Sequence, residues 1–195
     1  SEQTTQTNAD TSKQKPAKVI LRGKTMGTTF AITIEGFTDA LRLPKIESAI
    51  KQRLVDINQV MSTYIPASEI SKFNRSQTTD WYDVSKELLG IVQLAQSISV
   101  QSQGAFDITV GPAVNLWKFG PQTEASGTNH SDIPTADDVA QVLNHIGYQQ
   151  LHTRENPPGF KKNDPQLQID LSAIAKGYAV DQIIELLGAL QLDIQ

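Results

Sequence analysis

The chain has 195 residues, 38% of them hydrophobic, no cysteine and a formal net charge of −4 at pH 7. This length and apolar content allow one packed domain with a tail. The acidic balance argues against a general nucleic-acid binder, because phosphate backbones are bound by clustered Lys and Arg. The lack of cysteine excludes disulfides and thiolate metal sites, and the composition leaves the cellular compartment open.

Residues 1–18 are polar and contain almost nothing that a core could bury. We expect a disordered leader or tether here, because such a segment gains too little from burial to offset the entropy of ordering it. The periodic apolar patterns of a folded domain begin after it and extend over residues 19–195.

The first half of this domain combines a predicted strand pair with two predicted helices. Alternating apolar residues predict strands at 19–22 and 28–35 around a glycine-flanked turn. A helix opened by a proline is expected at 44–61, where isoleucine and leucine recur at helical spacing. A second helix is expected at 86–100 with Ser85 as its N-cap.

The second half predicts further helices and strands in irregular order. A Gly-Pro pair at 111–112 is typical of a helix start, and a capping-box pattern predicts a helix that reaches residue 145. Strands are expected at 148–153 and 167–170 around a Pro-rich turn, and a last helix at 172–190. This irregular order favours an α+β fold with a mixed or antiparallel sheet over a repeating βαβ series.

Residues 170–181 follow a short apolar run and open the last predicted helix. Such a junction offers backbone N–H groups and a partial positive charge that suit a phosphate. Asp170, Ala173 and Lys176 recur every three residues and form a stripe that drifts by about 60° per step. Together they can hold a diphosphate and a cation. The alternative is a capped amphipathic helix whose Asp170 and Lys176 lie in solvent.

Four separated blocks of the chain resemble one family when they are read together. They are residues 26–28, residues 61–64 with 68–74, residues 104–112 with 115–121, and residues 170–181. In this order and at these intervals they resemble the ApbE family, the FAD:protein FMN transferases once described as thiamine biosynthesis lipoproteins. The resemblance implies transfer of the FMN half of FAD onto a Thr or Ser hydroxyl of a target protein, with Mg²⁺ and release of AMP.

The resemblance also implies an architecture and a set of contacts. It predicts a T-fold-like FAD-binding domain, truncated at its C-terminus, because the later motifs that complete the metal site are not found. It places Ala105, Phe106 and Asp107 in the FAD pocket and Asp170 in contact with the cofactor. The backbone carbonyl of Ala173 would be a metal ligand. No residue can be named as the general base.

Physical properties favour three further residues for the same pocket. Met26, in its turn, offers a soft apolar wall for a flat ring. Tyr64 can pack its ring on the flavin, and Lys176 suits the diphosphate. Each candidate also has an ordinary interpretation: Met26 and Phe106 as core residues, Asp107 as a turn residue and Tyr64 as a residue at the rim of the domain.

Other residues are given no part in binding. Trp117 and Phe119 are interpreted as packing residues, and the three histidines lack the spacing of metal ligands.

Three functions stay open. The first is the FMN transferase, and the second is an FAD diphosphatase on the same scaffold. The third is a protein without catalytic activity, either a flavin-binding or assembly protein or an inert fragment. For the transferase, the resemblance implies a protein lipid-anchored at the periplasmic face of a bacterial inner membrane, soluble without its anchor. It further implies an acceptor protein, with a subunit of a membrane redox complex as one candidate, and no nucleic acid.

Overall fold

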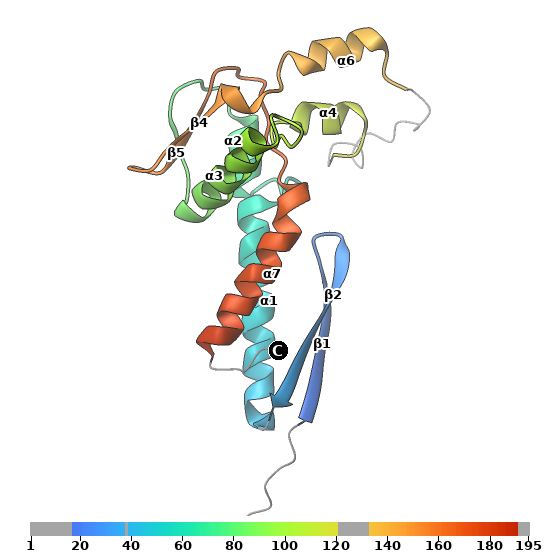
Figure 1. The fold of residues 1–195 in the computed structure, drawn as a ribbon, viewed down its shortest axis with the longest axis vertical. Coiled ribbons are helices and arrows are strands. Elements are labelled where there is room, and N and C mark those ends of the chain that lie inside the picture. The colour runs from blue at the N-terminus through green and yellow to red at the C-terminus, as the bar shows by residue number, and fades with distance from the viewer. Residues whose placement is uncertain (1–16, 38, 121–132, 191–195) are drawn as a thin grey trace, which may run out of the picture.

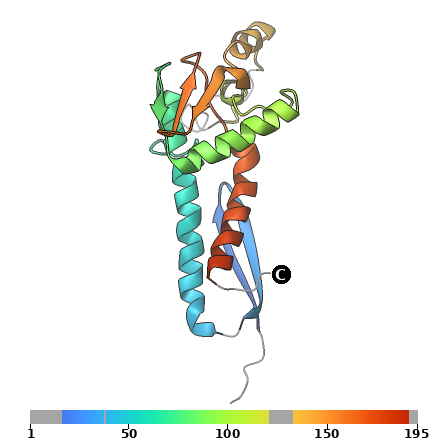
Figure 2. The same ribbon diagram turned by 60° about the vertical axis from the view of Figure 1, so that its left-hand side comes forward.

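The computed structural model describes residues 17–37, 39–120 and 133–190. The molecule is elongated: two long helices and a β-hairpin form one end, and the shorter elements gather at the other (Figure 1, Figure 2). In chain order the elements are β1 (Ala17–Thr25), β2 (Thr28–Phe37), η1 (Ala40–Arg42), α1 (Leu43–Met61), α2 (Glu69–Arg75), β3 (Tyr82–Asp83), α3 (Lys86–Gln101), α4 (Gly111–Leu116), α6 (Ala136–Leu143), η2 (Tyr148–Gln150), β4 (Leu151–Arg154), β5 (Gly159–Lys162) and α7 (Ser172–Ala189).

The strands form two antiparallel sheets. β1 pairs with β2, and three further strands pair in the order β3–β5–β4. The predicted α+β class is therefore confirmed. No helix in the described part of the chain is long and apolar enough to cross a membrane.

The predicted N-terminal strand pair is a tight hairpin. Thr25 pairs with Thr28 across a two-residue turn in which Met26 and Gly27 both have positive φ, 49° and 70°. Positive φ at both central residues matches the right-handed twist of the flanking strands, which favours this turn in hairpins. β1 begins at Ala17, earlier than predicted, and the rest of the predicted leader, residues 1–16, lies outside the described residues.

The helices predicted from local signals are confirmed. α1 begins beside Pro44 and buries one apolar stripe, and the Ser85 hydroxyl caps α3 by accepting a hydrogen bond from the Leu88 amide at 3.1 Å. α6 begins with the predicted capping box but ends at Leu143, two residues before the predicted end.

The strand predicted at 148–153 begins later, and the one predicted at 167–170 is wrong. Tyr148–Gln150 is a 3-10 turn, and β4 pairs with β5, a strand that the sequence did not indicate. Within the described part of the chain, the strand pairing of residues 167–170 is limited to an isolated parallel bridge from Gln168 to Val110. Their alternating apolar side chains point into the core, which gives a strand-like pattern without a neighbouring strand to pair with.

An aromatic cluster joins α2 to the three-stranded sheet. Phe73 is 1% exposed and packs edge-on against Tyr82 and Phe160, with ring centroids 5.5 and 5.4 Å away. The ammonium of buried Lys162 lies 5.1 Å from the Phe73 ring centroid and donates to the Leu167 carbonyl at 3.1 Å. Burial lowers the pKa of Lys162.

Three helices meet at one polar cluster. The Arg53 guanidinium of α1 contacts both carboxylate oxygens of Glu87 on α3, at 2.7 and 3.3 Å, and also Gln182 on α7. Tyr178 of α7 donates to the same carboxylate at 3.0 Å. Glu87 therefore raises the pKa of Arg53, while burial, followed by Glu87, raises the pKa of Tyr178. The cluster fixes α7 against α1 and α3.

The carboxylate of Asp164, shortly before residues 167–170, makes the stability of the fold depend on pH in the acid range. Asp164 Oδ2 lies 2.5 Å from His145 Nδ1, and Asp164 Oδ1 accepts from the Gln166 amide at 2.8 Å. Burial alone would raise the pKa of Asp164, but these hydrogen bonds outweigh it and hold the pKa below its ordinary value. The ionised Asp164 therefore contributes to the free energy of unfolding. This contribution is complete above the pKa of Asp in the unfolded chain, about 3.9, and is lost as the pH falls through the lower pKa of the folded state.

We therefore expect Asp164→Asn to flatten the acid limb of the stability curve. Between pH 6 and pH 3, its free energy of unfolding should fall less than that of the wild type, as measured by urea titration at each pH. Asp80→Asn, at an exposed position, serves as the control and should keep the wild-type pH dependence. Parallel curves for wild type and Asp164→Asn would contradict the expected role of Asp164.

Candidate functional site

A cavity of about 840 Å³ lies where the hairpin turn, the end of α1 and the start of α7 meet. This size suits a dinucleotide-like ligand better than a single ion. Met26, Tyr64, Asp170 and Lys176, four of the residues predicted to contact FAD, line it together. They come from three segments that are far apart in the sequence, because Asp170 and Lys176 both lie around the start of α7, so the fold brings these segments to one place.

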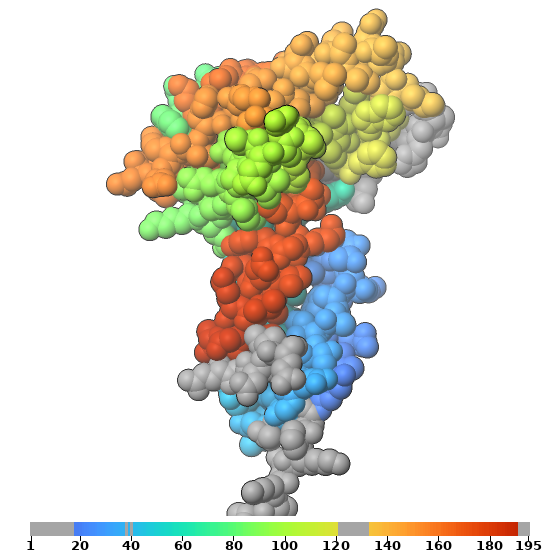
Figure 3. Space-filling view, viewed as in Figure 1, coloured from blue at the N-terminus to red at the C-terminus, as the bar shows by residue number. Residues whose placement is uncertain are grey.

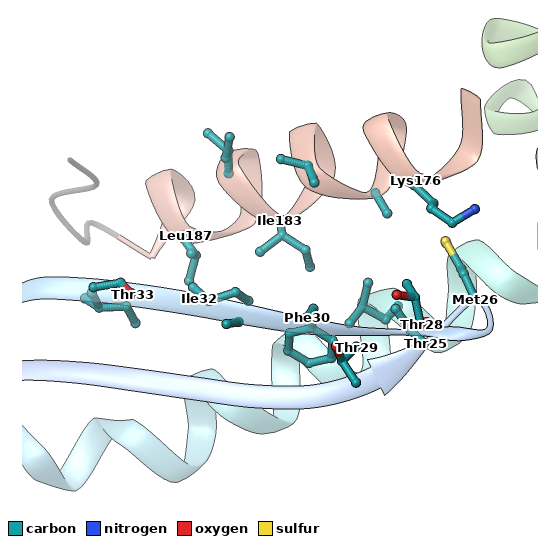
Figure 4. A pocket seen from close by; sticks show the side chains of 16 residues that line it. Thr25, Met26, Thr28, Thr29, Phe30, Ile32, Thr33, Lys176, Ile183 and Leu187 are labelled. Atoms are coloured by element: carbon teal, nitrogen blue, oxygen red, sulfur yellow. The ribbon is translucent and has the colours of Figure 1, made fainter. Parts of the chain in front are cut away.

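Met26 and Lys176 face each other at the boundary between this cavity and a second one. The second cavity, about 400 Å³, is an apolar groove between β2 and α7, and both residues line it as well. Figure 4 shows the Met26 sulfur and the Lys176 ammonium pointing toward one another near the hairpin turn, with Ile183 and Leu187 farther along the groove. In the space-filling view, α7 (red) and β2 (blue) lie side by side below the elements of the other end (Figure 3).

Lys176 is exposed and makes no hydrogen bond or ion pair with any described residue. No described residue therefore neutralises its charge, which is available to an anion. Because one side of its surroundings is apolar, an anion bound there would be partly shielded from water, which strengthens the attraction.

Tyr64 lies in the segment that follows α1 and lines the cavity. Its side chain is 54% exposed, and its hydroxyl donates to the Phe119 carbonyl at 2.9 Å. This hydrogen bond restrains the ring while leaving a large part of it accessible. A partly exposed aromatic ring of this kind can stack on a flat heteroaromatic ligand.

Asp170 lies just before α7 and lines the cavity. Its amide donates to the Ile108 carbonyl at 2.8 Å, and its Oδ1 accepts from the Ser172 amide at 2.7 Å. The other carboxylate oxygen has no hydrogen-bond partner among the described residues. It can therefore accept from a ligand hydroxyl or amide, or approach a cation.

The helix start offers fewer free amides than the sequence suggests. The Ser172 amide bonds to the Asp170 carboxylate, and the amides of Ile174 and Ala175 donate to the Leu171 carbonyl at 3.0 and 2.8 Å. Anion binding at this junction would therefore depend mainly on Lys176 and less on backbone N–H groups.

Four predicted site residues do not line the cavity. Ala105 is exposed, and Phe106 packs against the core. The Asp107 carboxylate accepts from the Thr109 amide and hydroxyl at 2.8 and 2.7 Å and from the Tyr148 amide at 2.8 Å, so it holds its own turn together. Ala173 is exposed on the first turn of α7. The ligand contacts of these residues stay predictions.

Phe119 and Asn58 also line the cavity, although the sequence predicts a role in binding for neither. Phe119, interpreted above as a packing residue, is 76% exposed and lines the cavity beside Tyr64, and Trp117 is 46% exposed, so the packing interpretation is wrong for both. Asn58 also lines the cavity, and its amide donates to the Thr25 hydroxyl at 3.0 Å and to the Leu54 carbonyl at 2.7 Å. In the sequence, Asn58 is one of several polar residues of an amphipathic helix. No sequence signal therefore distinguishes it from a polar residue that faces solvent.

The donors present would supply only part of a metal site. Within residues 17–37, 39–120 and 133–190, no group of three or more His, Cys, Asp or Glu side chains converges. The unpaired oxygen of Asp170 and the predicted Ala173 carbonyl are hard ligands of the kind that Mg²⁺ prefers. This set is compatible with a cation that takes its remaining ligands from water, substrate phosphates and other protein groups.

Comparisons with known proteins match nearly the whole chain. The model of the ApbE family matches residues 26–193. The FAD:protein FMN transferases of Salmonella typhimurium and Haemophilus influenzae are 34% and 36% identical over 178 and 182 residues, in each case 91% of this chain. The chain spans about half the length of these curated relatives, 50% and 51%.

Solved structures give the same result. The flavin transferase ApbE of Vibrio cholerae superimposes with a TM-score of 0.82 at 33% identity and covers 91% of this chain and 55% of that one. The apo flavinyl transferase ApbE of Pseudomonas stutzeri gives 0.80 at 28% identity and covers 92% and 55%. The chain therefore belongs to the ApbE family.

Proposed function

We propose that this chain is the FAD-binding part of a flavin transferase that moves FMN from FAD onto a Thr or Ser hydroxyl of an acceptor protein. The observation that carries the proposal is the cavity in which Met26, Tyr64, Asp170 and Lys176 meet. Relatives of the chain carry the name FAD:protein FMN transferase, which supplies the reaction class.

In this reaction the acceptor hydroxyl oxygen attacks the phosphorus on the FMN side of the diphosphate. A new P–O bond forms, the bond from that phosphorus to the bridging oxygen breaks, and the bridging oxygen leaves with AMP. The hydroxyl proton passes to a general base, to which no described residue is assigned. A bound Mg²⁺ would neutralise charge on the diphosphate.

Each residue has a defined part in this proposal. Tyr64 and Met26 would hold the flavin ring between an aromatic and a thioether surface. Lys176 would bind the diphosphate and offset the negative charge that develops on the leaving oxygen. Asp170 would accept a hydrogen bond from the cofactor or approach the cation, for which the Ala173 carbonyl would be a second ligand.

The proposal predicts that FAD binds more tightly than FMN. Lys176 would contact a diphosphate, whereas FMN has a single phosphate and lacks the adenosine half. One additional charged hydrogen bond corresponds to a preference of about tenfold or more. Isothermal titration calorimetry with both flavins measures this ratio, and equal affinities would remove the assignment of the diphosphate to this cavity.

Flavin transfer itself can be tested with the chain in its full natural length. The protein is incubated with FAD, Mg²⁺ and a candidate acceptor, and the acceptor is examined for flavin fluorescence in a denaturing gel. Transfer should require Mg²⁺ and stop in EDTA. Release of AMP and free FMN without labelling would instead assign an FAD diphosphatase, and binding without either product would assign a flavin-binding protein.

The family resemblance also leads us to propose where the complete protein works. It would be lipid-anchored at the periplasmic face of a bacterial inner membrane and would act on a subunit of a membrane redox complex. Fractionation of cells that express the complete gene, with immunodetection in membrane and periplasmic fractions, tests this location.

A further inference from the structure

One short helix, α2, contacts both walls of the candidate pocket. Ser68, Ser71 and Asn74 recur every three residues, from the N-cap of α2 to its last turn. Side chains at this spacing lie on one side of a helix, so the three polar groups form a single stripe. Their partners belong to different walls of the pocket.

The first two members hold the backbone that leads to Tyr64. The Ser68 hydroxyl donates to the Ser62 carbonyl at 2.6 Å. The Ser71 hydroxyl reaches the carbonyls of Ser62 and Thr63 at 3.2 and 3.3 Å. Both serines are buried, at 0% and 6% exposure, so water cannot readily replace these bonds.

The third member holds the backbone that leads to Asp170. The Asn74 amide donates to the Ile169 carbonyl at 2.8 Å, and the Ile169 amide donates to Asn74 Oδ1, also at 2.8 Å. Ile169 is fully buried, and no strand of the described residues pairs with its segment on this side. The Asn74 side chain therefore takes the place of a strand by satisfying both backbone groups.

We propose that the Ser68–Ser71–Asn74 stripe is a positioning device that fixes the spacing between Tyr64 and Asp170 and so preorganises the pocket for FAD. Tyr64, Asn74 and Asp170 together line a further cavity of about 540 Å³, which shares Tyr64 and Asp170 with the main one. A ligand that contacts both walls binds more tightly when their separation is set in advance, because binding then costs less ordering entropy. The inference rests on the proposed function.

Asn74→Ala and Ser71→Ala test the device. Each should raise the FAD dissociation constant about tenfold, measured by calorimetry at a temperature where the variant is fully folded. A purely structural role would lower the melting temperature but leave this constant unchanged, and that outcome would overturn the inference. Asn144→Ala, at an exposed position after α6, is the matched control and should bind like the wild type.

A second measurement does not depend on flavin. The chain has no native cysteine, so Ala67→Cys and Asp181→Cys, both at exposed positions, can carry spin labels without background. The distance distribution by pulsed electron resonance should be narrow in the otherwise wild-type chain and broader with Asn74→Ala. An unchanged distance distribution in Asn74→Ala would refute the role of the Ser68–Ser71–Asn74 stripe as a positioning device. Failure of the wild-type chain to bind FAD would instead refute the proposed function alone.

Discussion

Replacement of Lys176 by Ala is expected to raise the FAD dissociation constant about 10- to 100-fold. The Lys176 ammonium has no partner among the described residues, and Lys176 lines both the apolar groove (Figure 4) and the larger cavity beside it. A charged hydrogen bond in such a place is worth about 1.5–3 kcal/mol. The nearby helix-start amides are mostly used within the protein, so they cannot compensate for its loss.

The effect can be separated from a change in folding. Ala is a good helix former, so the melting temperature of Lys176→Ala should stay near that of the wild type. Lys86→Ala removes the same charge from an exposed position at the start of α3 and should leave FAD affinity unchanged. Lys176→Arg, which keeps the charge, should bind FAD better than Lys176→Ala. If Lys176→Ala binds FAD as tightly as the wild type, Lys176 does not contact the ligand and is a helix residue that faces solvent.

The sequence predicts those elements whose signals lie within a few residues of one another. Ser85 caps α3, the Thr135–Asp138 capping box opens α6, and the hairpin turn falls at Met26–Gly27. In each case the hydrogen bond or backbone angle that defines the boundary is made locally. Such features need no knowledge of which distant segments pack together.

The errors concern partners that are distant in the sequence. Leu167–Asp170 alternates like a strand, but its backbone is held by the Asn74 side chain and by Ile108. The strand that pairs with β3 and β4 is β5, which the sequence did not predict, and its Phe160 lies opposite Tyr82 and Thr153. Choices of this kind depend on the packing of the whole core and leave no periodic pattern in a short window.

The site shows the same division. Asp170 and Lys176 could be chosen from their spacing, and the fold brings both to one cavity with Met26 and Tyr64. The chemical type of Asp107 and the family resemblance predict it as a ligand contact, yet its carboxylate accepts hydrogen bonds from Thr109 and Tyr148. Only the structure shows which polar groups are already satisfied and which are left for a ligand.

The largest loss of stability is expected from Phe73→Ala. The Phe73 ring is 1% exposed, packs edge-on against Tyr82 and Phe160, and lies under the ammonium of buried Lys162. Its removal leaves a cavity that these rigid neighbours cannot fill and takes away an aromatic surface from a buried charge. We expect the free energy of unfolding to fall by about 3–5 kcal/mol, a large part of the about 5–15 kcal/mol of a typical domain.

Phe119→Ala provides the matched control, because the same side chain is removed from a position that is 76% exposed. Its free energy of unfolding should stay within about 0.5 kcal/mol of the wild type. Urea titration gives both values, and the melting temperature of Phe73→Ala should fall by about 6–20 °C. Since α2 also carries Ser71 and Asn74, a loosened aromatic cluster should weaken FAD binding as well. Equal losses of stability at the two positions would show that the cluster around Phe73 is not the main support of α2.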